Sequence, residues 1–177
     1  SEKFIDEVIS HDTQIDELGN VINEVTIKRT HTFTDDTYHQ WKKILNSYGL
    51  KDLPDPLIDI LGRGENKTTI RVYVPEGSTL IDATKATETK YDGDLKKTYF
   101  WTKMDLKAGE SKEITIKYKL PFVLQLNPIA TYKLTVQKQP GSKGSLFTKT
   151  IFADPKVYNL GTYPDTARLD ENGKTIY

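Results

Sequence analysis

Histidines are the first residues in this sequence whose type and spacing could do chemistry. His11, His31 and His39 are the three present, and no His-Glu-x-x-His motif occurs that would place two zinc ligands on one helical face. His11 and His31 fall in two segments that we expect to form a β-hairpin, where they could face each other as a two-histidine metal site. The interpretation that we favour is two exposed strand histidines with no ligand.

Acidic residues gather between residues 35 and 59, and a compact cluster of oxygen ligands can bind calcium. Calcium needs roughly six to eight oxygen ligands, and the spacing of an EF-hand loop is absent. Several of these residues stand where a helix would begin, which favours helix capping over a calcium site. The residues concerned are Asp35, Asp36, Asp52, Asp55 and Asp59.

Nucleophile motifs give no indication of catalysis. No serine sits in a Gly-x-Ser-x-Gly elbow, and there is no cysteine. Residues 62–65 are too short for a phosphate-binding loop and precede a strand rather than a helix. Paired carboxylates of the glycosidase kind do not stand out among the acidic residues. We therefore expect a non-enzymatic protein with no cofactor and no bound metal.

Aromatic residues support one binding hypothesis, a stacking platform for sugar rings. The alternative is that one face of each element is simply core, because aromatic residues at helical spacing usually pack inside. The candidate stacking residues are Tyr38, Trp41, Tyr48, Tyr99 and Trp101.

The composition of the chain excludes several kinds of partner and structural cross-link. Lys+Arg and Asp+Glu both number 25, so the net charge is zero, and we expect no binding to nucleic acid. The absence of cysteine excludes disulfides and cysteine-ligated zinc. No apolar run approaches the ~18 residues of a membrane span. The chain begins with Ser1, which we interpret as the start of a piece cut from a longer protein, whose anchor would lie outside it.

Local patterns predict elements that would position these residues. Alternating segments at 4–15 and 21–29 flank a glycine-containing turn and predict a β-hairpin. Capping residues at 34–37 and helical spacing predict a helix that Gly49 ends as its C′ residue. A short second helix is predicted from Pro56 to Leu61, with Gly62 stopping it. Residues 34–64 thus form a helical insertion, which we expect across an open end or edge of the sheets.

Strand patterns dominate the rest of the chain, at 69–74, 79–83, 98–104, 114–120, 131–137 and 146–152. Short strands without crossover helices predict an all-β fold, an antiparallel immunoglobulin-like β-sandwich of about 8–9 strands, with a closed barrel as the alternative. We expect the strand at 114–120 to end at Pro121, and residues 92–94 to form a loop. We divide the chain into a sandwich domain, 1–153, and a C-terminal extension, 154–177, whose Asn-Gly turn predicts a small hairpin.

Strand, proline and glycine motifs occur at 70–81, at 106–111 with 116–121, and at 132–141, and their order resembles the bacterial domain-of-unknown-function 4012 family. The hairpin at 16–30 also resembles the start of the C-terminal module of that family. The resemblance covers most of the chain and is weakest over 34–64 and after 153. It implies an immunoglobulin-like sandwich on the outer side of a bacterial membrane, in a membrane-anchored envelope protein without an established reaction.

Together these observations predict a non-catalytic, extracytoplasmic structural or interaction module of a larger bacterial cell-envelope protein. Its partners would be other envelope proteins or cell-wall polysaccharide, and it would meet the membrane only through segments outside this sequence. The alternative is a carbohydrate-binding module that uses exposed aromatic residues.

Overall fold

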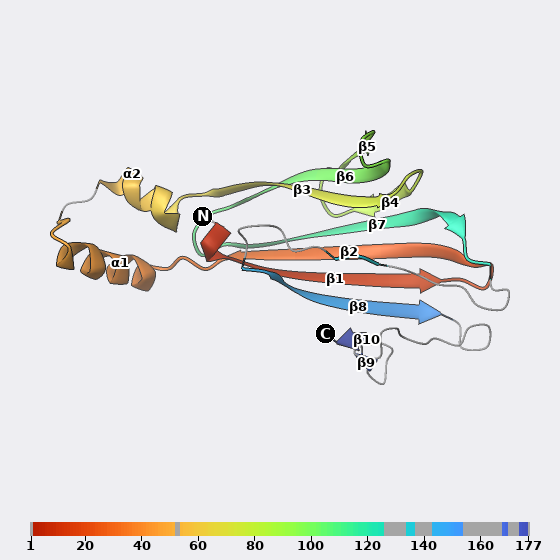
Figure 1. Ribbon diagram of the computed structural model, residues 1–177, viewed down its shortest axis with the longest axis horizontal. Helices are drawn as coiled ribbons and strands as arrows, with labels where there is room; N and C mark the ends of the chain where they lie inside the picture. Colours follow the sequence, from red (N-terminus) through yellow and green to blue (C-terminus); the bar gives the residue numbers. More distant parts are fainter. Residues whose placement is uncertain are drawn as a thin grey trace.

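Figure 1 shows a computed structural model of the chain, in which two β-sheets face each other and two helices extend beyond one end of them. The structure describes residues 2–51, 54–125, 134–136, 143–153, 168–169 and 174–176. The chain is mainly β and forms an antiparallel-dominated β-sandwich, as the strand patterns predict. The barrel alternative is wrong, because the strands divide between two separate sheets.

The larger sheet contains seven strands in the order β4-β7-β2-β1-β8-β10-β9, and the smaller contains three in the order β3-β6-β5. The strands of the larger sheet are β1 (Ile5–Ile15), β2 (Asn20–His31), β4 (Thr79–Ala83), β7 (Ser111–Val123), β8 (Ser145–Ala153), β9 (Arg168–Leu169) and β10 (Lys174–Ile176). Those of the smaller sheet are β3 (Asn66–Pro75), β5 (Glu88–Asp92) and β6 (Lys97–Leu106).

The predicted hairpin at the start of the chain is confirmed. β1 and β2 pair antiparallel from Ile5 opposite His31 to Ile15 opposite Val21. The Asp16 carboxylate closes the turn by accepting hydrogen bonds from the backbone N–H groups of Leu18, at 2.9 Å, and Asn20, at 2.8 Å. Gly19 has a φ of +80°, and a Cβ there would collide with the carbonyl of Leu124, so the turn requires glycine.

The apolar core lies between the two sheets. Side chains alternate along each strand, so one face of β6 and one face of β7 point inward. Phe100 and Met104 of β6 and Ile114 and Ile116 of β7 are all buried. Phe100 also packs against Tyr118, with ring centroids 5.4 Å apart. This packing holds the smaller sheet on the larger one.

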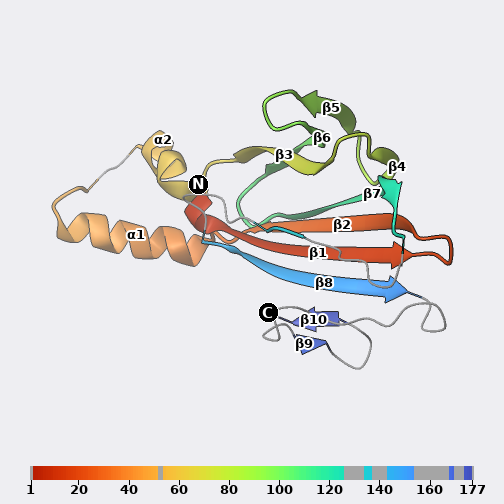
Figure 2. The ribbon, with the colours of Figure 1, turned by 45° about the vertical axis from the view of Figure 1, so that its right-hand side comes forward.

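The predicted helices are present between β2 and β3: α1 (Asp35–Ser47), α2 (Asp55–Ile58) and a π-helical turn (Asp59–Arg63). We call these three elements the helical projection. The Thr34 side chain caps α1 by accepting from the Thr37 N–H at 3.3 Å. The projection extends away from one end of the sandwich in both views, rather than along an edge strand (Figures 1 and 2). No described helix is long and apolar enough to cross a membrane.

One predicted strand boundary is wrong, and one strand was not predicted. β7 continues past Pro121 to Val123, because the β2–β7 register shifts between Asn20 and Ile22 and a proline is tolerated at such an irregularity. β5, which the sequence patterns did not predict, pairs antiparallel with β6. β5 lies at an exposed edge of the smaller sheet, where charged residues are common. Its sequence, ETKYD, is therefore polar and lacks the apolar alternation that predicts a strand.

The predicted all-antiparallel pairing is wrong at one place, since β8 pairs parallel with β1, from Glu7 opposite Ser145 to Ile15 opposite Ala153. A parallel pair needs a crossover long enough to return along the sheet, not necessarily a helical one, and the sequence between Val123 and Ser145 is long enough. Of the strand predicted at 131–137, residues 134–136 are not in a strand and the others lie outside the described residues. The C-terminal hairpin is confirmed by β9 and β10, and β10 also pairs with β8.

Candidate ligand-binding surface

The five aromatic residues predicted to stack on sugars lie in two separate places. Tyr38 and Trp41 lie on α1 of the helical projection, and Tyr48 is its C-cap residue. Tyr99 and Trp101 lie on β6 of the smaller sheet. Figure 1 shows that α1 and β6 occupy different parts of the molecule. A single platform of all five residues is therefore wrong, and each group must be considered alone.

The group on β6 belongs to the outer face of the smaller sheet. Thr98, Phe100 and Thr102 are buried, so Tyr99 and Trp101, which alternate with them, point away from the core. The antiparallel register places Tyr73 of β3 opposite Tyr99, and Arg71 opposite Trp101. We call Tyr73, Tyr99 and Trp101 on this surface the aromatic face.

The aromatic face is exposed to solvent in part. The rings of Tyr73 and Tyr99 lie 5.2 Å apart between centroids and are tilted by 35°. Tyr73 is 40% exposed, and its hydroxyl donates to the Asp92 carboxylate at 3.3 Å. No described element covers this face in either view (Figures 1 and 2). Tyr73 and Tyr99 thus form a tilted pair that a ligand can reach.

Cationic side chains lie over the rings of this face. The Lys90 ammonium is 4.2 Å from the centroid of the Trp101 ring and 2.9 Å from the Glu88 carboxylate. The Lys103 ammonium lies 5.6 Å from the same ring, and the Arg71 guanidinium lies 5.7 Å from the Tyr99 ring. Each is within the range of a cation–π interaction, which is worth about 0.5–1 kcal/mol at an exposed site. Such weak contacts leave the cations able to reorient toward a ligand.

The sequence reasoning missed Tyr73 and Arg71. The signal that could have identified them is the alternation over residues 69–74, which places both on the face opposite Ile70 and Val74. What the alternation alone does not give is the pairing of this strand with β6, and this pairing brings Tyr73 beside Tyr99.

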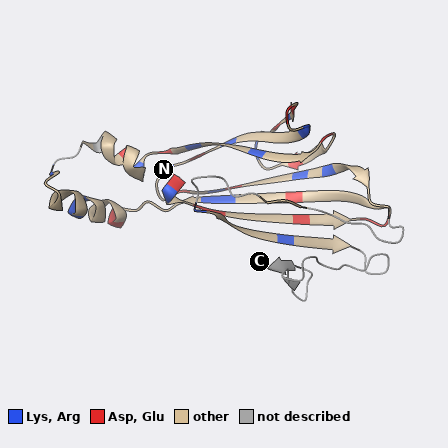
Figure 3. Cartoon of the chain, in the orientation of Figure 1, with Lys and Arg blue, Asp and Glu red and all other residues tan. Residues whose placement is uncertain are grey.

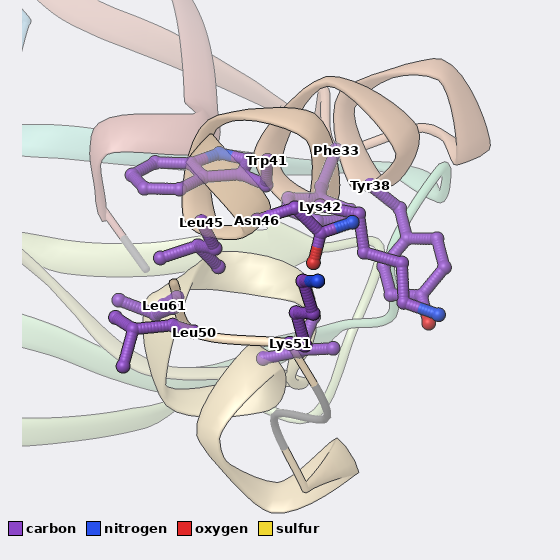
Figure 4. Close-up of a pocket in the computed structure, with 10 residues that line it drawn as sticks. Phe33, Tyr38, Trp41, Lys42, Leu45, Asn46, Leu50, Lys51 and Leu61 are labelled. Atoms are coloured by element: carbon purple, nitrogen blue, oxygen red, sulfur yellow. The ribbon is translucent and has the colours of Figure 1, made fainter. Parts of the chain in front are cut away.

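The other aromatic group lines a groove on the helical projection (Figure 4). Trp41 and Leu45 of α1 lie beside Leu50 and Leu61, and Tyr38, Lys42 and Lys51 are also among the lining residues. Tyr48 lies outside this lining and is 79% exposed. The Lys3 ammonium lies 5.6 Å from the Trp41 ring centroid. This groove is lined mainly by apolar side chains, whereas the aromatic face also presents cations and carboxylates.

The two histidines that were considered as a metal site do not face each other. The register places His11 opposite Val25 and Ile5 opposite His31, so the two histidines lie at different levels of the hairpin. Both are also buried, at 4% and 0% exposed, so the expectation of two exposed strand histidines is wrong as well. Their alternation with outward residues shows that both occupy the inner face of the larger sheet. His39 is exposed on α1.

His11 belongs to a buried polar network that the sequence did not predict. The Lys149 amine of β8 lies 2.7 Å from His11 Nδ1 and donates to the Thr13 hydroxyl. His11 Nε2 lies 3.2 Å from the Tyr118 hydroxyl, and the Thr13 hydroxyl donates to the side-chain oxygen of Asn23. The parallel β1–β8 register places Lys149 opposite His11, and so creates the network.

Burial dominates the ionisation of this network. It lowers the pKa of Lys149 to about 7, although the charge of Asp12 opposes the shift. It also lowers the pKa of His11 to about 3, and the charge of Lys149 lowers it further. The residues of the network are buried, so we assign it to the interior rather than to a binding surface.

The acidic residues of the helical projection that the structure describes stand at a helix start or in an ion pair. Asp35 and Asp36 lie in the first turn of α1, where carboxylates favour the helix dipole. The Asp59 carboxylate pairs with Arg63 at 2.6 Å. Asp52 lies outside the described residues, and Asp55 begins α2. In the part of the chain that the structure describes, no group of three or more His, Cys, Asp or Glu residues could hold a metal ion.

Comparison with known proteins gives only distant similarities. No family model matches the chain, and no curated protein matches it. An M1 zinc metallopeptidase from Deinococcus radiodurans is similar with a TM-score of 0.40 and 11% identity, over 97% of this chain and 37% of that chain. A mutant of an M1 zinc metallopeptidase from the same organism, bound to a Tyr-Ser-Ala substrate, gives a TM-score of 0.38 and 12% identity over the same shares. This chain spans a little over a third of the length of those enzymes, and similarity this weak transfers no activity to it.

Proposed function

We propose that this chain is a non-catalytic module of an extracytoplasmic bacterial cell-envelope protein, and that it binds a polysaccharide through the aromatic face. The observation that carries the proposal is the arrangement of Tyr73, Tyr99 and Trp101 on one uncovered sheet face. The envelope location follows from the family resemblance of the strand and turn motifs and is part of the proposal.

The chemistry of the aromatic face suits a sugar chain. Aromatic side chains offer an apolar body on which the C–H face of a sugar ring can stack, and a tyrosine also offers a polar hydroxyl. Tyr73 and Tyr99 are cross-strand neighbours, while Trp101 follows Tyr99 on the same face of β6. The carboxylates of Glu88 and Asp92, on the adjacent edge strand, supply hydrogen-bond acceptors for sugar hydroxyls. An extended ligand lying across the three strands would meet both kinds of group.

The non-catalytic part of the proposal rests on where reactive groups lie. The described groups with the most altered acidity, His11 and Lys149, are buried on β1 and β8 of the larger sheet, and neither belongs to the aromatic face. The face itself presents aromatic rings, cations and carboxylates on the outer side of the smaller sheet. An open surface of this kind suits binding, since catalysis in general uses a concave site that excludes water.

A panel of purified bacterial envelope polysaccharides tests the proposal. We expect the immobilised chain to retain at least one of them, and we expect Trp101→Ala and Tyr73→Ala to weaken retention by at least tenfold. The matched control is Tyr48→Ala, which removes an aromatic ring that is 79% exposed on the helical projection. Retention of no polysaccharide, or equal loss with the control, would overturn the proposal.

A further inference from the structure

The charges on the aromatic face are not balanced, although those of the whole chain are. The outward positions of β3, β5 and β6 follow from the register, and they carry more cations than carboxylates. The cations are Lys67, Arg71, Lys90, Lys97 and Lys103, and the carboxylates are Glu88, Asp92 and Asp105. Figure 3 shows Lys and Arg recurring along β3 and β6, while both signs are spread over the rest of the molecule.

Two of these cations stand beside the rings and have no acidic partner among the residues that the structure describes. Among the described residues, Lys90 pairs with Glu88, and Lys67 pairs with Glu65. Within the same part of the chain, Arg71 and Lys103 form no ion pair with a carboxylate, and each lies within cation–π distance of a ring of the face. Their charges are therefore available to an anionic ligand that approaches the rings.

From this geometry we infer that the aromatic face is selective for an acidic saccharide, a sugar chain that carries carboxylate or phosphate groups. The inference rests on the proposed function and names its ligand class. Sugar rings stack on Tyr73, Tyr99 and Trp101, while Arg71 and Lys103 pair with the acidic groups. Arg71 can do so in a bidentate manner, because its planar guanidinium matches the geometry of a carboxylate or phosphate.

A single-stranded nucleic acid is the other polymer that uses aromatic rings together with cations. The face favours the saccharide because Glu88 and Asp92 lie among the rings and cations. These carboxylates accept hydrogen bonds from the several hydroxyls of each sugar ring, whereas a nucleotide within a DNA strand has no free hydroxyl and one within an RNA strand has only the 2′-hydroxyl.

Isothermal titration calorimetry with short oligomers tests the inference. The probes are an α-1,4-linked galacturonic acid hexamer, maltohexaose as the neutral counterpart, a phosphorylated maltohexaose, inorganic polyphosphate and an oligo-dT. We expect the galacturonate or the phosphorylated hexamer to bind at least tenfold more tightly than maltohexaose. We also expect that affinity to fall as NaCl rises from 50 to 500 mM, because exposed ion pairs are screened.

Charge-removing variants identify the residues that carry the selectivity. We expect Arg71→Gln combined with Lys103→Gln to weaken binding of the acidic hexamer by roughly tenfold and to leave maltohexaose unchanged. These are exposed polar substitutions on a strand face, so thermal unfolding should be unaffected. Lys28→Gln is the matched control, because Lys28 is an exposed cation on β2.

Each result separates this inference from the proposed function. Equal affinity for the acidic and neutral hexamers would overturn the charge selectivity and leave the polysaccharide function standing. Tighter binding of oligo-dT or polyphosphate than of any hexamer would overturn the saccharide assignment. Loss of binding in Lys28→Gln equal to that in the double variant would show a diffuse charge effect and overturn the assignment to Arg71 and Lys103. Binding of none of the probes would overturn the inference, and the polysaccharide panel then decides the proposed function independently.

Discussion

The sandwich and the helical projection are stabilised in different ways. The sandwich buries apolar side chains from both sheets, and Phe100, Ile116 and Val21 are completely enclosed. The α1 helix contains no buried residue, and the projection is anchored at its base by Phe33 and Ile58, which are 3% and 4% exposed. The comparison indicates that folding stability resides in the sandwich, while the projection depends on a small contact at its base.

The largest expected effect comes from the core of the sandwich. Phe100→Ala removes a fully buried ring that contacts Tyr118, and we expect the free energy of unfolding to fall by about 3–5 kcal/mol. Urea denaturation followed by circular dichroism measures this. A loss below 1 kcal/mol would contradict the view that the two sheets depend on each other for stability.

An intermediate effect is expected at the base of the projection. Ile58→Ala removes a buried side chain, and we expect a cost of about 2–4 kcal/mol that is confined to the projection. Hydrogen exchange should accelerate in α1 and α2 while the amides of β2 and β7 keep their protection. Leu57→Ala is the control, because Leu57 is a neighbouring residue that is 43% exposed. Equal loss of protection in β2 and β7 would show that the projection and sandwich unfold together.

The sequence predicts the local elements well because their signals are local. Thr34 caps α1 and Asp16 with Gly19 closes the first turn, and each of these acts within a few residues. β5 was not predicted because an edge strand does not need an apolar alternation. The parallel pairing of β8 was not predicted because nothing within its own residues specifies which strand it will lie beside.

Local sequence signals do not specify which strands pair, and this also limits what could be predicted of the candidate surface. Tyr99 and Trp101 share a strand, so alternation alone is enough to place them on one face of β6. Their partners Tyr73 and Arg71 come from β3, and only the strand pairing identifies them. The buried network shows the limit again, because His11 and Lys149 lie on strands far apart in sequence.

The pH dependence of the free energy of unfolding tests whether buried Lys149 destabilises the sandwich. Lys149 has a pKa of about 7 when folded against 10.5 as the ordinary value, so between these pH values the unfolded chain binds a proton that the folded chain lacks. The free energy of unfolding should therefore rise with pH across this window, by at most about 1.4 kcal/mol per pH unit. His11 contributes with the same sign between about 3 and 6.5.

The Lys149→Met variant isolates this contribution. It replaces the buried amine with an apolar side chain of similar length, so we expect higher stability than the wild type at pH 7 and a smaller rise between pH 7 and 9. Urea denaturation at pH 7, 8 and 9 measures both. Lys28→Met is the control, since it removes an exposed ammonium from the same sheet. Parallel pH profiles for the wild type and Lys149→Met would show that Lys149 is not responsible.

The smallest expected effect comes from the far part of the projection. Tyr48 is 79% exposed, and a substitution at such a position usually changes stability by less than about 0.5 kcal/mol, so Tyr48→Ser should leave the free energy of unfolding within that range. The same urea titration used for Phe100→Ala measures it. A loss above 1 kcal/mol would mean that Tyr48 packs against some part of the protein in solution, and the contrast between a stable sandwich and a weakly anchored projection would then fail.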